Sequence, residues 1–231
     1  MTPNQIYFYH IRKCGGQSIY HAIFQALTGA SSEDVEHWLT WSNIIICEGK
    51  VIIGWHAPHI NRHKFNFAFG HFAMHELLPM PEDIFTFTCF REPSERVISH
   101  YRMLKGFRET GTRGDVLKAE KGWSQFETFG EFVELLPDVH MLRQLYMFSA
   151  EYNVDEALEN INNLSYWFTM DNFAEKIKEF GKVLGLNLKT RHVMPSHSEF
   201  DGTSDELGML REKLEPEYEL WEALKKQNGT T

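Results

Sequence analysis

Short apolar runs alternate with longer, helix-like segments along this chain, and this alternation constrains the fold more than any other feature of the sequence. Aromatic and β-branched residues dominate the runs at 6–10, 67–71, 84–90 and 165–170. Runs of this length are typical of strands buried in a parallel sheet. The first three are each followed by a segment that we expect to be helical. The pattern therefore predicts an α/β fold, a single domain over 1–231 with a central, mainly parallel sheet flanked by helices.

Apolar periodicity and end signals place the helices. Pro93 and the nearby Glu95 mark a helix start, and Pro137 divides a long apolar segment. Asp171 or Asn172 is a possible cap for the helix that follows, and Gly185 is its stop signal. The predicted helices are 18–27, 93–107, two within 123–150, one from about 154, 173–184 and 204–226. Since ligands of such folds bind beyond the carboxyl ends of the strands, the residues that follow 6–10, 67–71 and 84–90 are the candidates for a site.

Composition limits the possible partners. The net charge of -9 argues against nucleic-acid binding, which needs a clustered basic surface. No apolar run is long enough to span a membrane, and the first residues do not resemble a signal peptide, so we expect a cytoplasmic protein with no membrane partner. Three cysteines without metal-type spacing predict free thiols.

The strongest local signal is a Gly-Gly pair between the first strand and the first helix. Gly15 and Gly16 let the backbone approach an anion, and the following helix offers free N–H groups and its positive dipole end. Lys13 could reach a phosphate oxygen, and the Ser18 hydroxyl could add a hydrogen bond. This predicts a phosphate-binding strand-loop-helix that is P-loop-like, although the lysine precedes the glycines, unlike the order GxxxxGK[ST].

A second basic signal follows the run at 84–90. Arg91 ends that run, and Ser99 lies about two turns into the next helix. The planar guanidinium of Arg91 suits phosphate oxygens, and the short serine side chain lets an anion sit close. Both could face a second phosphate.

These two segments carry a family resemblance. HIRKCGGQS at 10–18 resembles the HIPKTGGTS loop of sulfotransferases that use 3′-phosphoadenosine-5′-phosphosulfate (PAPS), specifically the group that includes carbohydrate O-sulfotransferases. FREPSERVISHYR at 90–102 resembles that family's RDPxxRxxSxY segment, which binds the 3′-phosphate of the donor. The resemblance implies that PAPS is the co-substrate, that adenosine 3′,5′-bisphosphate is the product, and that the donor contacts Arg12, Lys13, Cys14, Gly15, Gly16, Gln17, Ser18, Arg91 and Ser99.

His71 is the candidate base. Gly70-His71 resembles the strand end of the same family, whose histidine is the catalytic base in some members. A neutral imidazole with a pKa of about 6.5 can accept the proton of a hydroxyl near neutral pH. The resemblance thus implies Lys13 and His71 as catalytic residues. The pairs His71/His75 and His59/His63 have HxxxH spacing but lack further ligands, so we expect no metal site.

The acceptor is the less constrained half of the prediction. The segments 36–65 and 106–122 are expected to lie on the acceptor side, and the candidate contacts are Trp38, Trp41, Trp55, His56 and His75. An acidic chain suits a small hydroxylated metabolite, such as a natural product, better than a sulfated polymer. A carbohydrate O-sulfotransferase, a nucleotide-dependent kinase and a non-catalytic nucleotide-binding module are the alternatives.

Overall fold

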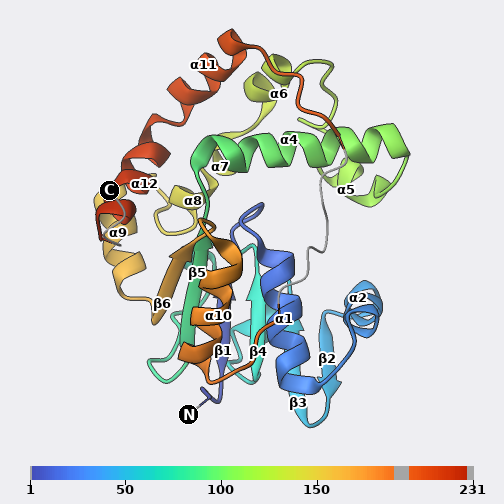
Figure 1. Cartoon of the computed structure of the whole chain (residues 1–231), viewed down its shortest axis with the longest axis vertical. Helices are drawn as coiled ribbons and strands as arrows, with labels where there is room; N and C mark the ends of the chain where they lie inside the picture. Colours follow the sequence, from blue (N-terminus) through green and yellow to red (C-terminus); the bar gives the residue numbers. More distant parts are fainter. Residues whose placement is uncertain (1, 190–197, 228–231) are drawn as a thin grey trace.

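The computed structural model describes residues 2–189 and 198–227. Within them, six strands form one sheet in the order β2-β3-β4-β1-β5-β6 (Figure 1). All neighbouring strands are parallel except β2 and β3. The predicted α/β fold with a mainly parallel sheet is confirmed, and the four predicted strands are β1, β4, β5 and β6. The bounds are β1 (Ile6–Tyr9), β2 (Ile44–Cys47), β3 (Lys50–Gly54), β4 (Phe67–Gly70), β5 (Phe85–Phe90) and β6 (Tyr166–Thr169).

The strand register brings the candidate segments together. Tyr9 of β1 pairs with Gly70 of β4 on one side and with Thr88 of β5 on the other. Because these strands are parallel, their carboxyl ends meet at one edge of the sheet. The loop after β1, His71 after β4 and Arg91 after β5 therefore all leave from the same edge.

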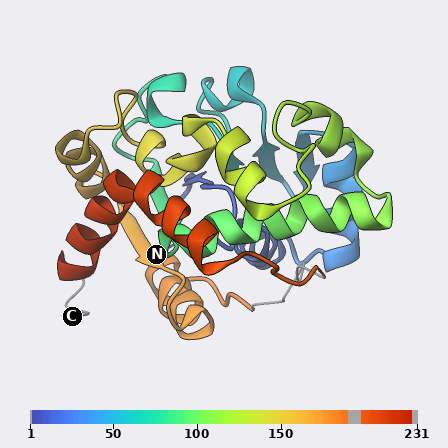
Figure 2. The same ribbon diagram turned by 90° about the horizontal axis from the view of Figure 1, so that it is seen from above.

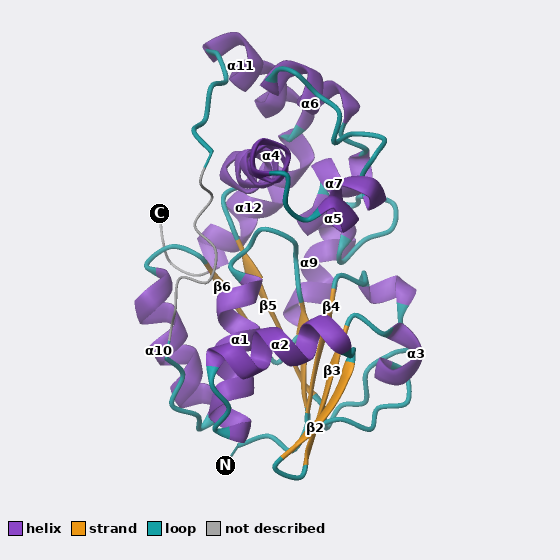
Figure 3. Ribbon diagram, turned by 90° about the vertical axis from the view of Figure 1, so that its right-hand side faces the viewer, coloured by secondary structure: helices purple, strands orange, loops and turns teal. Residues whose placement is uncertain are grey.

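Helices cover both faces of the sheet. On one face, α1 (Gly16–Thr28) and α10 (Phe173–Leu184) pack on the even-numbered side chains of β1, where the Phe8 and Phe87 rings stack with centroids 4.6 Å apart. On the other face, α9 (Val154–Asn162) and α12 (Glu215–Gln227) pack in the core that contains Tyr7 and Tyr9. Figure 3 shows α1 and α10 on the same side of the strands.

A third group of helices lies beyond the carboxyl edge. It contains α4 (Pro93–Thr110), α5 (Gly114–Ala119), α6 (Phe129–Leu135), α7 (Asp138–Met141) and α11 (Ser204–Lys213). Tyr101 of α4 packs there against Phe126, Phe129 and Phe132. Figure 1 shows α4 above the sheet, and Figure 2 shows the group from above. The candidate loops therefore lie between the sheet and this helical layer.

The sequence pattern missed the helices and strands between α1 and β4. The segment 36–65, which we predicted to lie on the acceptor side, contains the end of α2 (Ser32–Trp41), the antiparallel hairpin β2–β3 and the short helix α3 (Ala57–Ile60). The hairpin turn is Glu48-Gly49, and both residues have positive φ, 48° and 70°. Two such residues form the tight turn that matches strand twist, and glycine favours that conformation. The Ile-rich run before this turn is a local signal from which a strand could have been predicted.

Several predicted helices have different bounds. The two expected within 123–150 are three short helices, α6, α7 and α8 (Arg143–Tyr146). The single helix expected over 204–226 breaks at Leu214, because Pro216 has no N–H with which to continue the helical hydrogen bonds. The segment after β4 is not a longer helix but the 3-10 turn η1 (Met74–Glu76), and Pro79 and Pro81 follow it.

The predicted helix 173–184 and its stop at Gly185, which has a φ of 65°, are confirmed. No helix within the described ranges is both long enough and apolar enough to cross a membrane.

Candidate active site

The loop between β1 and α1 ends in unused hydrogen-bond donors. Lys13 and Gly15 both adopt left-handed backbone conformations, with φ of 71° at each. The first helical hydrogen bond runs from the Ile19 N–H to the Gly15 carbonyl, over 3.2 Å. The N–H groups of 15–18 have no acceptor within the described part of the chain. They point from a helix N-terminus, where a negative charge is stabilised.

Both glycines of the loop are needed by the fold itself. A Cβ on Gly16 would lie 1.7 Å from Nε2 of His10, because the His10 ring packs directly against the Gly16 backbone. His10 is 5% exposed, and its ring stacks on Phe8 with centroids 5.1 Å apart. Gly15 needs its positive φ, and a Cβ there would approach the Phe173 ring to 3.0 Å. The Gly-Gly pair therefore keeps the loop close to β1 as well as open to an anion.

Replacing Gly16 by alanine should destabilise the protein by about 1–3 kcal/mol, because the buried His10 ring would have to move. For a chain of this size, that corresponds to a fall in Tm of roughly 2–12 °C in a thermal melt. Gly208→Ala is the matched control, since Gly208 lies in α11 with no atom within 4 Å of the added Cβ. Alanine there should raise the stability by about 0.5–1 kcal/mol. Equal melting temperatures for the two variants would contradict the tight His10–Gly16 contact.

Lys13 is a partly buried cation beside other cations. Its ammonium group has no ion pair or hydrogen bond with any residue of 2–189 or 198–227. Burial, followed by the charges of Arg12 and Arg91, lowers its pKa to about 8. The Arg91 guanidinium lies against the same loop, with Nη1 donating to the Lys13 carbonyl over 3.3 Å and Nε 3.2 Å from Glu95 Oε2. This loop therefore carries concentrated positive charge within an acidic protein.

The serines are available as donors, but they lie on different helices. Ser18 is in the first turn of α1 and Ser99 is in the second turn of α4; neither side chain hydrogen-bonds to the described residues. Ser99 lies one turn beyond Glu95, the partner of Arg91. Gln17 is partly buried beside Ser18. The predicted donor residues of 15–18 and Arg91 are thus at the sheet edge, and Ser99 lies in α4, one turn beyond Glu95.

His71 is held in one tautomer. Its Nδ1 is 2.8 Å from the carbonyl oxygen of His10, and because a carbonyl only accepts, Nδ1 carries the proton. In the neutral ring, Nε2 then has a free lone pair. Burial lowers the pKa of His71 to about 3, so the ring is neutral at physiological pH. The ring centroid lies 4.3 Å from that of His10, which itself packs on Gly16. The expected pKa of about 6.5 is therefore wrong, because burial disfavours the charged ring, and His71 is a neutral, weakly basic proton acceptor next to the loop.

The side chains of Cys14 and Arg12 contact protein groups. Cys14 is fully buried, its Sγ is 3.5 Å from Oε1 of Gln144, and burial raises its pKa to about 12. Arg12 forms an ion pair with Glu120. The Cys14 N–H also donates to the Ile11 carbonyl over 3.3 Å, so this predicted donor-binding residue is occupied by contacts within the protein.

Sequence reasoning missed a polar cluster around Glu120. This buried carboxylate accepts from Arg12, from His100 Nε2 over 2.9 Å and from Trp123 Nε1 over 3.1 Å. Burial alone raises the pKa of Glu120, but the hydrogen bond from His100 and the charge of Arg12 outweigh it and keep the pKa below its usual value. Burial lowers the pKa of His100 to about 3, so we assign the ion pair to Arg12 and Glu120, with His100 neutral. Glu120 lies in a polar stretch with no periodic pattern, so no local signal indicated it.

The Arg12–Glu120 pair joins the two halves of the predicted site. Arg12 belongs to the loop after β1, and Glu120 belongs to the predicted acceptor-side segment 106–122. That segment contains the end of α4 and all of α5. The pair thus attaches the segment to the loop through a charge-assisted contact that is largely shielded from solvent.

The predicted acceptor residues are dispersed. Trp55 is in ring contact with His71, at 6.4 Å between centroids, and it packs edge-on against Phe69 at 4.9 Å. Nδ1 of His56 is 2.8 Å from Nδ1 of His59. Trp38 is partly buried and packs against the core at Phe24 of α1, while His75 is exposed beside Tyr146. The side chain of Trp41 lies outside the described part of the structure.

Metal ligands do not gather in the site. Among the described residues, no three His, Cys, Asp or Glu side chains are placed to hold a metal ion. Two surface pockets, of about 480 and 330 Å³, are lined by residues of α11–α12 and by residues 108–125, respectively. Neither pocket is lined by Lys13, His71 or Arg91.

Comparison with protein-family models and with curated proteins finds no match for this chain. The fold places it among α/β proteins with one mainly parallel sheet. A function has to be inferred from the residues at the carboxyl edge of that sheet and from the resemblance of 10–18 and 90–102 to sulfotransferase motifs.

Proposed function

We propose that this protein is a PAPS-dependent sulfotransferase that transfers a sulfo group to a hydroxyl of a small acceptor. The observation that carries the proposal is the position of His71. Its unprotonated Nε2 belongs to a ring that contacts His10. Beside it lie the N–H groups of 15–18 and the ammonium of Lys13, which have no partner among the described residues. An anion site and a proton acceptor at one sheet edge are the two parts that sulfo transfer to a hydroxyl needs.

The donor would bind along the P-loop-like segment. Backbone N–H groups of 15–18 and the Ser18 hydroxyl would hold the 5′-phosphosulfate, while Arg91 and Ser99 would hold the 3′-phosphate. Arg91 would exchange its exposed contact with Glu95 for the phosphate, a change that costs little because exposed ion pairs contribute about 0–1 kcal/mol.

The proposed sulfo transfer requires PAPS, the acceptor hydroxyl and side chains of this protein. The acceptor oxygen attacks sulfur, its proton passes to Nε2 of His71, and the bond from sulfur to the bridging phosphate oxygen breaks. The products are a sulfate ester and adenosine 3′,5′-bisphosphate. Lys13 and the loop N–H groups stabilise the negative charge that develops on the leaving phosphate.

The acceptor is proposed to be a small hydroxylated compound, such as a natural product. A sulfated polymer would need a strongly basic cleft, whereas this chain has a net charge of -9 and pairs Arg12 internally with Glu120. Trp55, in ring contact with His71, is the proposed acceptor contact among the residues predicted from sequence.

Nucleotide binding separates this proposal from a kinase. Adenosine 3′,5′-bisphosphate at 100 times its Kd should stabilise the protein by about 2.7 kcal/mol without magnesium, which a thermal-shift titration would register as a rise of roughly 5–11 °C. ATP with magnesium should give a smaller shift at the same concentration. A larger shift with magnesium ATP would favour a kinase and contradict the proposal.

Binding alone would also fit a non-catalytic module, so turnover is the second part of the test. The protein, PAPS and a panel of hydroxylated metabolites should yield a product that is heavier by one sulfo group in mass spectrometry. Stabilisation by the bisphosphate without transfer to any acceptor would favour the module.

A further inference from the structure

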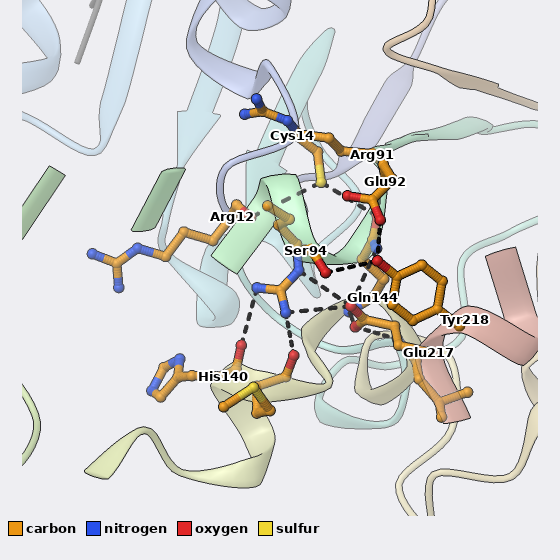
Figure 4. Close-up of polar contacts among 12 residues, drawn as sticks. Arg12, Cys14, Arg91, Glu92, Ser94, His140, Gln144, Glu217 and Tyr218 are labelled. Atoms are coloured by element: carbon orange, nitrogen blue, oxygen red, sulfur yellow. Dashed lines mark hydrogen bonds and ion pairs between the residues drawn. The ribbon is translucent and has the colours of Figure 1, made fainter. Parts of the chain in front are cut away.

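Gln144 connects the two segments proposed to bind the donor phosphates. It lies in α8 and is 1% exposed. Its Oε1 accepts from the Arg91 backbone N–H over 2.8 Å and lies 3.5 Å from Sγ of Cys14 (Figure 4). One amide oxygen therefore contacts both the loop after β1 and the first residue after β5.

A buried carboxylate fixes the orientation of this amide. Glu217 of α12 is fully buried; its Oε1 accepts from the Gln144 backbone N–H over 2.6 Å, and its Oε2 accepts from Gln144 Nε2 over 3.3 Å. Oε2 also pairs with Arg96, over 3.3 Å to Nη2. Since Glu217 accepts from Nε2, the amide oxygen of Gln144 must face Arg91 and Cys14.

Arg96 ties this network to the helical layer. It is 1% exposed and donates to the backbone carbonyls of His140 and Met141. A buried charge that is paired and fully hydrogen-bonded in this way is costly to move. Glu217, which Arg96 holds in place, thus fixes the Gln144 side chain. The amide oxygen of Gln144 in turn fixes the positions of the loop after β1 and of Arg91.

The spacing of the two anion-binding segments depends on this oxygen. Arg91 also donates from its side chain to the Lys13 carbonyl over 3.3 Å, so the segments contact each other at two points. The side-chain contact is partly exposed and would be given up or changed when a phosphate binds, whereas the Gln144 contact is buried and faces no ligand.

We infer that Gln144 is a positioning residue that sets the distance between the loop at 10–18 and Arg91, and thereby the preference for a nucleotide with phosphates at both the 3′ and 5′ positions over a 5′-monophosphate. The inference rests on the proposed function, because it assigns one phosphate to each segment. Gln144 itself touches no substrate.

The test is the ratio of two affinities. Calorimetry would give the Kd of adenosine 3′,5′-bisphosphate and of adenosine 5′-monophosphate for the wild type and for Gln144→Met, which keeps the length of the side chain but removes its polar atoms. We expect the preference for the bisphosphate to fall by about tenfold, as when one well-placed hydrogen bond is lost. The monophosphate, which uses one segment, should change by less than about threefold.

Tyr218→Phe is the matched control. Tyr218 neighbours Glu217 on α12, and its hydroxyl contacts Glu92 and Ser94 without reaching Gln144. Its removal disturbs the same region, so its affinity ratio should stay within about twofold of the wild type. If Tyr218→Phe and Gln144→Met lowered the preference for the bisphosphate equally, the effect would come from general destabilisation of the region. That result would overturn the inference.

A second variant decides the question if Gln144→Met does not give a cooperative melt. Cys14→Ala removes the thiol that contacts the amide oxygen of Gln144. We expect it, too, to lower the preference for the bisphosphate over the monophosphate. An unchanged ratio in the variant that folds overturns the role of Gln144 and leaves the proposed function standing. A wild type that binds both nucleotides equally overturns the proposed function and this inference together.

Discussion

Replacing Lys13 by alanine should lower kcat by about 10²–10³, because a cation next to the leaving phosphate would be lost from a partly buried site. The ammonium of Lys13 has no competing ion pair within the described ranges, and it lies among Arg12, Arg91 and the free donors of the loop. Sulfo transfer from PAPS, followed by mass spectrometry of the product, measures the effect. Lys178→Ala, on an exposed position of α10, should leave turnover unchanged.

The pH dependence should identify the same residue. Lys13 has a pKa of about 8, so its charged form is complete below that pH and is lost above it. The kcat/KM of the wild type should therefore fall as the pH rises through 8. Lys13→Arg keeps its charge at every accessible pH, and any activity that it retains should lack this alkaline decline. Turnover of Lys13→Ala within fivefold of the wild type would contradict the assigned role.

Replacing His71 by alanine should lower kcat by about 10²–10⁴, the usual contribution of a positioned general base. Nδ1 of His71 donates to the His10 carbonyl, which leaves Nε2 to take the acceptor proton. The pKa of about 3 means that the neutral form is present throughout the pH range 5–8. Protonation of His71 should therefore cause no acidic decline of kcat/KM in that range.

His71→Asn separates the structural role from the catalytic one. An asparagine amide can still donate to the His10 carbonyl, but it has no basic nitrogen. It should melt near the wild-type temperature, bind adenosine 3′,5′-bisphosphate within about threefold of the wild type, and be as slow as the alanine variant. An asparagine variant with near wild-type turnover would show that the imidazole contributes only its hydrogen bond.

Local sequence signals accounted for the elements that position the site. The apolar runs at 6–10, 67–71 and 84–90 predicted the strands β1, β4 and β5, since buried strands differ from helices in length and composition. The hairpin β2–β3 was missed because its Ile-rich run lies among tryptophans and histidines that indicated ligand contacts. Its turn at Glu48-Gly49 is a local signal that would have predicted it.

The candidate site residues could also be predicted from local signals, because they occupy a glycine turn or the end of a strand. The Gly-Gly pair, Lys13, His71 and Arg91 directly follow predicted strands, and parallel pairing brings such residues to one edge. Trp38 and His75 were predicted as acceptor contacts, but the structure places them apart from each other, and no local signal could have shown this. Aromatic residues serve core packing and ligand contact equally well, and only their neighbours distinguish the two.

The sequence by itself determined the order of the strands β1, β4, β5 and β6 and the positions of Gly15, Gly16, Lys13 and His71 after them, because these depend on residues near one another in the chain. Only the tertiary structure decided which groups hold the loop in place. Arg12 meets Glu120 across 108 positions, and Gln144 meets Glu217 across 73. Such contacts depend on how the helices pack beyond the sheet edge. Residues that are near in sequence therefore do not predict which buried polar groups pair with one another.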